Sequence, residues 1–473
     1  MAQSSFVEPI QFGTDGWRSV IADTYTFDNV RVIAQALAQH LLKNQAQNVP
    51  NGVAIGYDTR FLSEEFARTT AETLAQNGVP ALLSDRDCPT PAIAWATRSR
   101  QCAAGIMITA SHNPPKYNGF KFLLPQGRGA DTASTKSVES FLRRESSTRI
   151  APATVTEFDA RPAFMTQLRQ VIDVDLLKKA RGRAVCDFVH GVGRNYLDDF
   201  LRECDWDVTT LRGNPDPMFG GILPDPANPA CHKALQERVL ETKSDLGLAN
   251  DPDADRFGAV DSTGEYITPN QVLALVYLHL LQHRQMEGAV ARTVATTCLL
   301  DAIAHRHNQK VVETAVGFKW LGEKIDDGEA ILGGEESGGL SIANHCPNKD
   351  GILADLLIAE VWSTDAGKAP LSTRYAQVME KYGTFYSDRI DVHLSAEAKD
   401  KLMNQMKTAP PQQFAGVRVA NVVSIDGVKL NLEDGSWLLL RASGTEPLVR
   451  VYFEAQGQGR LEELRKAAIE LSD

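Results

Sequence analysis

The sequence has 473 residues, of which 43% are hydrophobic and 23% are charged. That length exceeds what one ordinary core fills, so we expect three or four domains of roughly 100–150 residues each, and the composition argues against extensive disorder. A formal net charge of -11 excludes the basic surface that a nucleic-acid partner usually requires.

The first block, residues 1–150, alternates strand-like and amphipathic helical runs. Residues 53–57 predict a buried strand, and residues 64–77 predict a helix that Ser63 caps and Gly78 ends. Two further strands are expected over residues 103–109 and 120–124.

Two blocks of similar texture follow, at residues 151–261 and 262–371, and their alternation predicts α/β units on mostly parallel sheets. The second block has expected strands over residues 183–189 and 245–249, and the third has a helix over 269–283 and strands over 291–296 and 310–314. The last block, residues 372–473, is richer in strands and predicts a smaller α+β domain. Its expected strands cover residues 385–394, 417–424, 437–441 and 449–455.

The cysteine pattern and the apolar runs indicate where such a chain works. Seven cysteines are scattered without a C-x-x-C pair, which favours reduced thiols in a cytosolic protein over disulfides or a zinc site. The apolar run at residues 272–281 is shorter than the ~20 residues that cross a bilayer. We therefore expect a soluble, cytoplasmic protein with no membrane partner, present as a monomer or weak dimer.

Residues 109–121 directly follow a predicted strand, where α/β folds place active sites. The segment carries Ser111, His112 and Lys121. A hydrolase elbow is not indicated, because Thr109 and Asn113 replace the glycines of G-x-S-x-G. Ser111 could instead carry a phosphoryl group that a cation neutralises, although a capping role in a turn stays open.

Asp251, Asp253 and Asp255 alternate just after the strand predicted at residues 245–249, so their side chains should point to one side. Three carboxylates suit Mg²⁺, and like charges this close repel unless a cation binds. An EF-hand is rejected, because Arg256 and Ser262 occupy the positions of its required Gly and Glu. The alternative is an acidic turn with capping aspartates.

Three further loops offer ligand-binding groups. Residues 333–339 combine glycines with two carboxylates and a hydroxyl, which suits sugar hydroxyls but also a flexible acidic turn. Residues 441–450 place hydroxyls and backbone N–H groups between two arginines, which suits a phosphate monoester unless the arginines are merely solvated. Residues 12–18 form a glycine-rich loop that ends in Arg18. No P-loop pattern is present, and Gly191 and Gly193 lack a dinucleotide fingerprint.

Taken together, these motifs resemble the α-D-phosphohexomutase family of phosphoglucomutases and phosphomannomutases, in order and spacing, from residue 12 to residue 455. The resemblance implies three related α/β domains and a smaller C-terminal α+β domain around a central cleft. It also implies one Mg²⁺ per chain and a hexose 1,6-bisphosphate activator. The residues so implicated are, for catalysis, Ser111, Lys121, His112, Arg18, Arg256 and His345; for substrate, Lys319, Glu335, Glu336, Ser337, Arg441, Ser443, Gly444, Thr445 and Arg450; and for the metal, Ser111, Asp251, Asp253 and Asp255.

The implied reaction interconverts hexose 1-phosphate and hexose 6-phosphate through a phosphoserine at Ser111 and a bisphosphate intermediate. Lys121 is the expected base, with its pKa lowered by Mg²⁺ and Arg256. Glu336 beside Glu335 favours glucose phosphate over mannose phosphate. The alternatives are a glucose-1,6-bisphosphate synthase with an external phosphoryl donor, a phosphoglucosamine mutase, a metal-dependent phosphohydrolase and, least favoured, a non-enzymatic sugar-phosphate binding protein.

Overall fold

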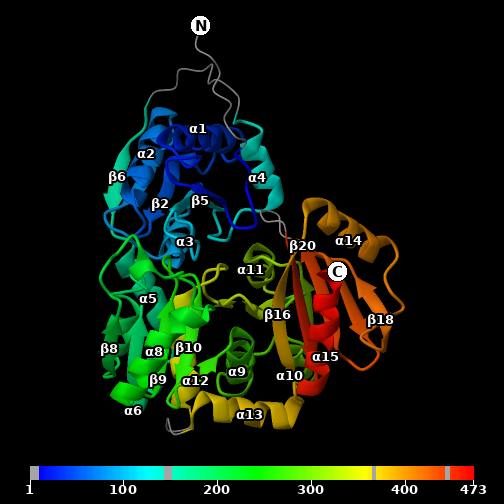
Figure 1. The fold of residues 1–473 in the computed structure, drawn as a ribbon. Coiled ribbons are helices and arrows are strands. Elements are labelled where there is room, and N and C mark those ends of the chain that lie inside the picture. The colour runs from blue at the N-terminus through cyan, green and yellow to red at the C-terminus, as the bar shows by residue number, and fades with distance from the viewer. Residues whose placement is uncertain (1–9, 143–151, 365–368, 443–447, 473) are drawn as a thin grey trace.

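The computed structural model describes residues 10–142, 152–364, 369–442 and 448–472. Figure 1 shows the N-terminal unit (blue to cyan) above the green and yellow central units, with the C-terminal unit (orange to red) packed at their side. Three units contain mixed sheets with helices and the fourth an antiparallel sheet, which confirms the expected fold class. In the described part of the chain, no helix is long and apolar enough to cross a membrane.

The first unit has a six-stranded sheet in the order β1-β5-β4-β2-β3-β6. Strands β2 and β4 are parallel and buried along their whole length, because helices cover the sheet. The elements are β1 (Trp17–Val20), α1 (Phe27–Asn44), η1 (Val49–Asn51), β2 (Val53–Tyr57), α2 (Ser63–Gln76), β3 (Ala81–Ser84), α3 (Thr90–Ser99), β4 (Ala104–Ile108), β5 (Tyr117–Leu123), α4 (Thr132–Glu139) and β6 (Val155–Phe158).

Helix α2 begins differently from the prediction. Leu62 occupies the capping position in a left-handed conformation with φ of 60°, and Ser63 is the first helical residue. The Ser63 hydroxyl donates to Asp58 Oδ1 over 2.7 Å instead of capping the helix. The expected cap at Ser63 is therefore wrong, because a buried carboxylate binds its hydroxyl.

The second unit has the strand order β11-β10-β9-β7-β8 and the third β13-β12-β14-β15. One hydrophobic core runs through both units, and helix α12 is buried along its whole length within it. The second unit contains α5 (Arg161–Val171), α6 (Val174–Ala180), β7 (Arg183–Asp187), α7 (Leu197–Glu203), β8 (Asp207–Leu211), η2 (Phe219–Gly221), α8 (Pro229–Thr242), β9 (Leu246–Asn250), β10 (Phe257–Asp261) and β11 (Tyr266–Ile267). The third contains α9 (Pro269–Gln282), β12 (Ala289–Thr293), α10 (Leu299–Arg306), β13 (Val311–Thr314), α11 (Phe318–Asp326), β14 (Ala330–Glu335), β15 (Gly339–Ile342), α12 (Gly351–Ser363) and α13 (Leu371–Tyr382).

The fourth unit has the strand order β16-β21-β20-β19-β18-β17 and a core of its own. All four strands expected here are present. A small apolar cluster joins the unit to the third and contains Val294, Ala295, Trp437, Leu439 and Tyr452. The elements are β16 (Tyr386–His393), α14 (Ala396–Thr408), β17 (Gln413–Phe414), β18 (Val417–Val423), β19 (Val428–Leu432), β20 (Trp437–Ala442), β21 (Leu448–Ala455), α15 (Gln458–Ile469) and η3 (Glu470–Ser472).

All three expected domain boundaries differ from the units that pairing and packing define, and the one at residue 261 does so because β11 pairs with β10. Strand β6 lies beyond residue 150, yet it pairs with β3 in the first sheet, so we place the end of the first unit at Phe158. Helix α13 lies beyond residue 371, yet it packs against α9 and α10, so we extend the third unit to Tyr382. Figure 1 shows α13 running below the third unit toward the fourth.

Candidate active site

The serine loop, residues 109–116, joins β4 to β5 at the carboxyl end of β4. Ser111 is fully buried and has φ of 51°, in the left-handed region where a non-glycine residue is strained by about 1–3 kcal/mol. Its Oγ donates to Asp251 Oδ2 over 2.7 Å and lies 3.4 Å from His112 Nδ1. The hydroxyl therefore points from the first unit into the second.

The acidic loop, residues 251–256, connects the antiparallel strands β9 and β10. Asp251, Asp253 and Asp255 are each 0% exposed, and ligand atoms of the three carboxylates lie within 4.8 Å of one another. Asp251 Oδ1 accepts the backbone N–H groups of Asp255 and Arg256, each at 3.0 Å, which fixes the curl of the loop. The three carboxylates converge, as their alternate spacing predicts.

The donor set of this cluster fits a divalent cation. Asp253 Oδ1 and Asp255 Oδ1 are buried and accept no hydrogen bond from any residue that the structure describes. A buried carboxylate oxygen without a donor is costly, and Mg²⁺ prefers such hard oxygen ligands. Burial, reinforced by Asp253 and Asp255, also raises the pKa of Asp251 well above its usual range, which a bound cation would reverse.

Lys121 on β5 lies against the acidic loop. Its Nζ lies 2.7 Å from Asp253 Oδ2 and 3.2 Å from Asp15 Oδ2, and it also donates to Asp255 Oδ2. Burial alone would lower the pKa of Lys121, but these three carboxylates outweigh burial and raise it. Among the protein groups the anions dominate, so the expected lowering of this pKa by Mg²⁺ stays a prediction.

Two site residues, Asp15 and Lys349, were not predicted. Asp15 Oδ2 lies 2.8 Å from Lys349 Nζ and 3.2 Å from Arg18 Nη2, and Lys349 Nζ lies 3.4 Å from Asp255 Oδ2. Burial raises the pKa of Asp15, but Lys121, Lys349 and Arg18 outweigh burial and lower it. Asp15 lies inside the glycine-rich loop that drew attention to Arg18, so the signal was present.

Arg18 and His112 complete the surroundings of Ser111. Arg18 Nη1 donates to Asn113 Oδ1 over 2.7 Å and to the Ala110 carbonyl over 3.2 Å, which ties it to the serine loop. Burial, together with nearby cations led by Arg256, lowers the pKa of His112 well below its usual range. The Ser111 hydroxyl thus lies between the Asp251 carboxylate and a neutral imidazole, and the Arg18 guanidinium binds the same loop.

A cavity of about 1010 Å³ opens where the second, third and fourth units meet, and Arg256, Glu336 and Ser337 lie on its wall. Arg256 Nη1 lies 3.5 Å from Asp225 Oδ1. Glu336 Oε2 accepts hydrogen bonds from two threonine hydroxyls, and burial together with Glu335 raises the pKa of Glu336. Glu335 itself closes β14, so the loop predicted from residue 333 begins three residues later, at Glu336.

The structure describes only part of the loop predicted to bind phosphate, residues 441–450. Arg441 on β20 and Arg450 on β21 are register partners, so two guanidiniums flank the connection between these strands. Arg441 Nε donates to Asp426 Oδ2 over 2.8 Å. The other predicted residues of this loop lie outside the described residues, namely Ser443, Gly444 and Thr445.

The contacts that the structure gives for Lys319 and His345 lie outside the serine loop. Lys319 Nζ donates to Thr132 Oγ1 over 3.3 Å, between the third and first units. His345 Nε2 lies 2.8 Å from Asp350 Oδ2, and its ring packs near Trp95. These contacts join neither side chain to Ser111 or to the acidic loop, so a direct catalytic role for His345 stays a prediction.

Known proteins place this geometry in a family. Four models of the phosphoglucomutase/phosphomannomutase family match in succession: α/β/α domain I over residues 9–149, domain II over 162–264, domain III over 268–382, and the C-terminal domain over 397–471. A phosphoglucomutase/phosphomannomutase from Thermococcus kodakarensis is 30% identical, with 97% of this chain and 98% of that protein aligned.

Two further relatives support the same family assignment. A protein from Methanothermobacter thermautotrophicus, assigned as a phosphoglucosamine mutase, is 31% identical over 95% of this chain and 94% of its own length. The crystal structure of a protein from Thermus thermophilus, assigned as a phosphomannomutase, superimposes with a TM-score of 0.84 at 33% identity, covering 98% of this chain and 99% of that one. The chain therefore belongs to the phosphoglucomutase/phosphomannomutase family of α-D-phosphohexomutases, and it is a mutase, an intramolecular phosphotransferase.

Proposed function

We propose that this mutase interconverts hexose 1-phosphate and hexose 6-phosphate by passing a phosphoryl group through Ser111, with hexose 1,6-bisphosphate as the intermediate. The observation that supports this most directly is the 2.7 Å hydrogen bond from Ser111 Oγ to Asp251 Oδ2. This bond places a buried hydroxyl beside the carboxylate cluster. In that cluster, Asp253 Oδ1 and Asp255 Oδ1 accept no hydrogen bond from the described residues. A serine beside such a cluster can carry a phosphoryl group without the G-x-S-x-G elbow of a hydrolase.

Asp251, Asp253 and Asp255, with an oxygen on phosphorylated Ser111, would hold one Mg²⁺, whose charge would neutralise the phosphoryl oxygens. The Lys121 amine donates hydrogen bonds to Asp253 Oδ2 and Asp255 Oδ2, and these carboxylates together with Asp15 raise its pKa. We therefore assign Lys121 an electrostatic role rather than that of the base.

In the transfer step, the free hydroxyl oxygen of the sugar attacks phosphorus while the bond from phosphorus to Ser111 Oγ breaks. The proton of that hydroxyl must move as the new bond forms, and Ser111 Oγ finally regains one. His112 Nδ1 lies 3.4 Å from Oγ, within a short adjustment of hydrogen-bond reach, so we assign the proton transfer to His112. Arg18, anchored to the same loop, places positive charge beside the transferring group.

The rest of the substrate would lie along the cavity. Arg441 and Arg450 would bind the phosphate that does not react, together with the connection between their strands. Glu336 and Ser337 on the cavity wall, with Glu335 beside them, would bind sugar hydroxyls. After the first transfer the bisphosphate turns over, and its second phosphoryl group returns to Ser111. Free bisphosphate would load an unphosphorylated Ser111, which explains an activating role.

We expect glucose phosphate to be preferred, with mannose phosphate accepted, because Glu336 beside Glu335 resembles the pair of glucose-type members of the family. Phosphoglucosamine is the second candidate substrate, and the 31% identity to the Methanothermobacter thermautotrophicus protein supports it. A bisphosphate synthase or a phosphohydrolase would use the same residues but would release the bisphosphate or free phosphate.

Product analysis tests the proposal. The protein is incubated with the 1-phosphates of glucose, mannose or glucosamine, Mg²⁺ and a trace of glucose 1,6-bisphosphate, and every product is identified by ³¹P NMR. The 6-phosphate should accumulate fastest from glucose 1-phosphate. Accumulating bisphosphate would identify a synthase, and free phosphate a hydrolase. Fastest turnover of glucosamine 1-phosphate would select the second candidate.

Two controls test the serine and the cation separately. Ser111→Ala should fold and lose turnover, whereas Ser140→Ala, at an exposed serine, should keep it. EDTA should stop turnover and Mg²⁺ should restore it. Full activity of Ser111→Ala would refute the phosphoserine, and activity in excess EDTA would refute the metal site.

A further inference from the structure

The connection between β2 and α2 carries a buried ion pair that neither the predicted chemistry nor the cavity uses. Arg60 Nε lies 3.2 Å from Asp58 Oδ2, and both side chains are 0% exposed. Both residues border a separate hollow of about 450 Å³ rather than the large cavity. A fully buried arginine needs several hydrogen-bond acceptors, and the acceptors of Arg60 indicate its role.

The guanidinium of Arg60 binds four backbone carbonyls, all from the serine loop and the start of β5. Nη2 donates to the Ser111 carbonyl over 2.5 Å and to the Asn113 carbonyl. Nη1 donates to the Pro114 and Tyr117 carbonyls, each over 2.9 Å. The loop is wrapped around one planar, five-donor group, a geometry that the three donors of a lysine ammonium cannot reproduce.

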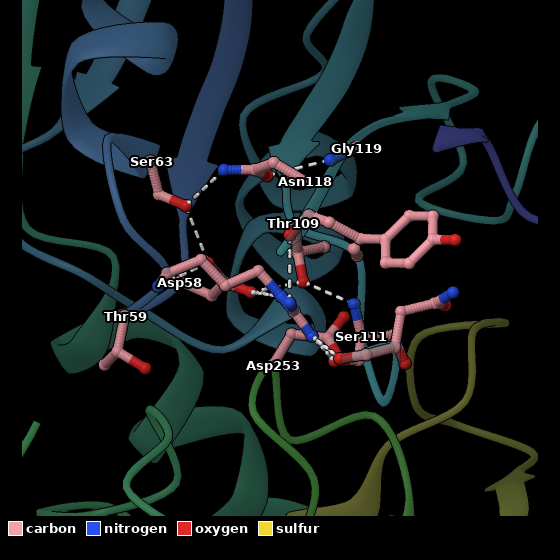
Figure 2. A network of polar contacts seen from close by, with 12 residues as sticks. Asp58, Thr59, Ser63, Thr109, Ser111, Asn118, Gly119 and Asp253 are labelled. Atoms are coloured by element: carbon pink, nitrogen blue, oxygen red, sulfur yellow. Dashed lines mark hydrogen bonds and ion pairs between the residues drawn. The ribbon is translucent and has the colours of Figure 1, made fainter. Parts of the chain in front are cut away.

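Asp58 fixes the backbone N–H of Ser111 through Thr109, whereas Arg60 binds the Ser111 carbonyl. Thr109 Oγ1 donates to Asp58 Oδ2 over 2.6 Å and accepts the backbone N–H of Ser111 over 2.8 Å. Figure 2 shows this chain of contacts from Asp58 through Thr109 to Ser111, with Ser63 on the far side of the carboxylate. The N–H and the carbonyl of Ser111 are therefore both held by side-chain groups that depend on the Asp58–Arg60 pair.

This double anchor explains how Ser111 keeps its conformation. A φ of 51° is unfavourable for serine and persists only where surrounding contacts fix it. With both backbone groups fixed, the direction of Cβ is fixed as well, and Oγ stays on Asp251 Oδ2 at 2.7 Å. We propose that Asp58 and Arg60 are positioning residues, which hold Ser111 in its strained conformation so that Oγ faces the acidic loop; the proposal rests on the proposed role of Ser111.

The test uses kinetic constants, because a merely structural role would not separate them. Arg60→Lys keeps the charge but loses the fork, and Thr109→Val keeps the shape but loses the hydroxyl link. Each should lower kcat by roughly 10- to 100-fold, since small misplacements of a reacting atom cost that much. The KM for sugar phosphate should stay within about twofold, because neither side chain borders the cavity. Thr109→Ser, which keeps the hydroxyl, should retain nearly full kcat.

Arg68→Lys is the matched control, because Arg68 lies on the neighbouring helix with 47% of its side chain exposed, and its kcat should not change. Phosphorylation of Ser111 by glucose 1,6-bisphosphate, followed by intact mass, should slow in Arg60→Lys and Thr109→Val in step with kcat. If Arg60→Lys fails to fold, Thr109→Val against Thr109→Ser decides alone. Unchanged kcat in folded Thr109→Val, or a KM that rises with the loss, would overturn the inference while wild-type phosphorylation at Ser111 still stands. Full activity of Ser111→Ala would instead overturn the proposed function, and this inference with it.

Discussion

Replacing Lys121 with methionine tests how the site balances charge. The Lys121 side chain is 2% exposed and contacts Asp15, Asp253 and Asp255. Methionine is similar in length and apolar, so the change removes the cation while largely filling its space. The variant leaves a cluster of buried carboxylates with less positive charge beside it, and it should be less stable in EDTA than the wild type.

The size of the loss follows from the burial of the partners. Removing one member of a buried ion pair costs about 3–5 kcal/mol, because the remaining charge is uncompensated. Lys349 Nζ still lies 3.4 Å from Asp255 Oδ2, which places the expected loss toward the lower end. A cation bound by the folded protein at 100 times its Kd adds about 2.7 kcal/mol, so Mg²⁺ should offset much of the deficit in the variant.

The measurement is urea unfolding of both proteins, once in EDTA and once in saturating Mg²⁺. Mg²⁺ should stabilise Lys121→Met more than the wild type, because the variant has lost the competing cation. Lys116→Met, at an exposed lysine of the serine loop, should behave as the wild type in both buffers. A deficit of equal size with and without Mg²⁺ would refute the idea that lysine and metal share one carboxylate cluster.

Three more results are expected. Asp426→Asn removes the charged partner of Arg441 Nε, which lies 2.8 Å away, so the KM for sugar phosphate should rise roughly tenfold with little change in kcat; an unchanged KM in steady-state assays would contradict this. A Cβ on Gly351 would lie 2.1 Å from a carbonyl of the acidic loop, so Gly351→Ala should weaken Mg²⁺ binding in calorimetry, whereas Gly457→Ala, with nothing within 4 Å, should not; equal Mg²⁺ affinity in both would argue against the contact. Burial lowers the pKa of His279 below 6.5, so as the pH falls from 7 to 5 the unfolded chain binds this proton before the folded one does, and the free energy of unfolding should decrease. In urea unfolding, His279→Gln should reduce that decrease. An equal decrease in the variant and the wild type would show that His279 is not its cause.

Local patterns predicted much of this protein because they act over short distances. The strand β2 occupies its expected residues, since a fully buried run needs no distant partner to be recognised. One rule places the loops of Ser111 and Asp251 each at the carboxyl end of a strand, but the two strands belong to different sheets, so the contact between the loops depends on how the first two units pack. Strand β6 was missed because three of its four residues are exposed and carry no apolar alternation.

The errors within the site have a different cause. The motif places Lys121 ten residues after Ser111, but only the fold shows that three carboxylates contact its amine. Arg60 escaped notice because its acceptors are backbone carbonyls, which every residue possesses and no motif records. Its position after β2 was a usable signal, since the rule that singled out the serine loop applies equally to the carboxyl end of that strand.

The contacts between units also show which units are held firmly together around the site. Ser111, Lys121 and Thr90 of the first unit bind aspartates of the second through buried side chains. Separating these units would also expose the apolar core that they share, which includes Ile93 and Met107 of the first unit and Phe164 of the second. The fourth unit has its own core and meets the third through a small apolar cluster and a few polar contacts, such as Cys298 N–H to Glu454 Oε1 at 2.9 Å. Access for a sugar phosphate is therefore least costly at the fourth unit, which carries the two arginines of the phosphate site and none of the described groups around Ser111.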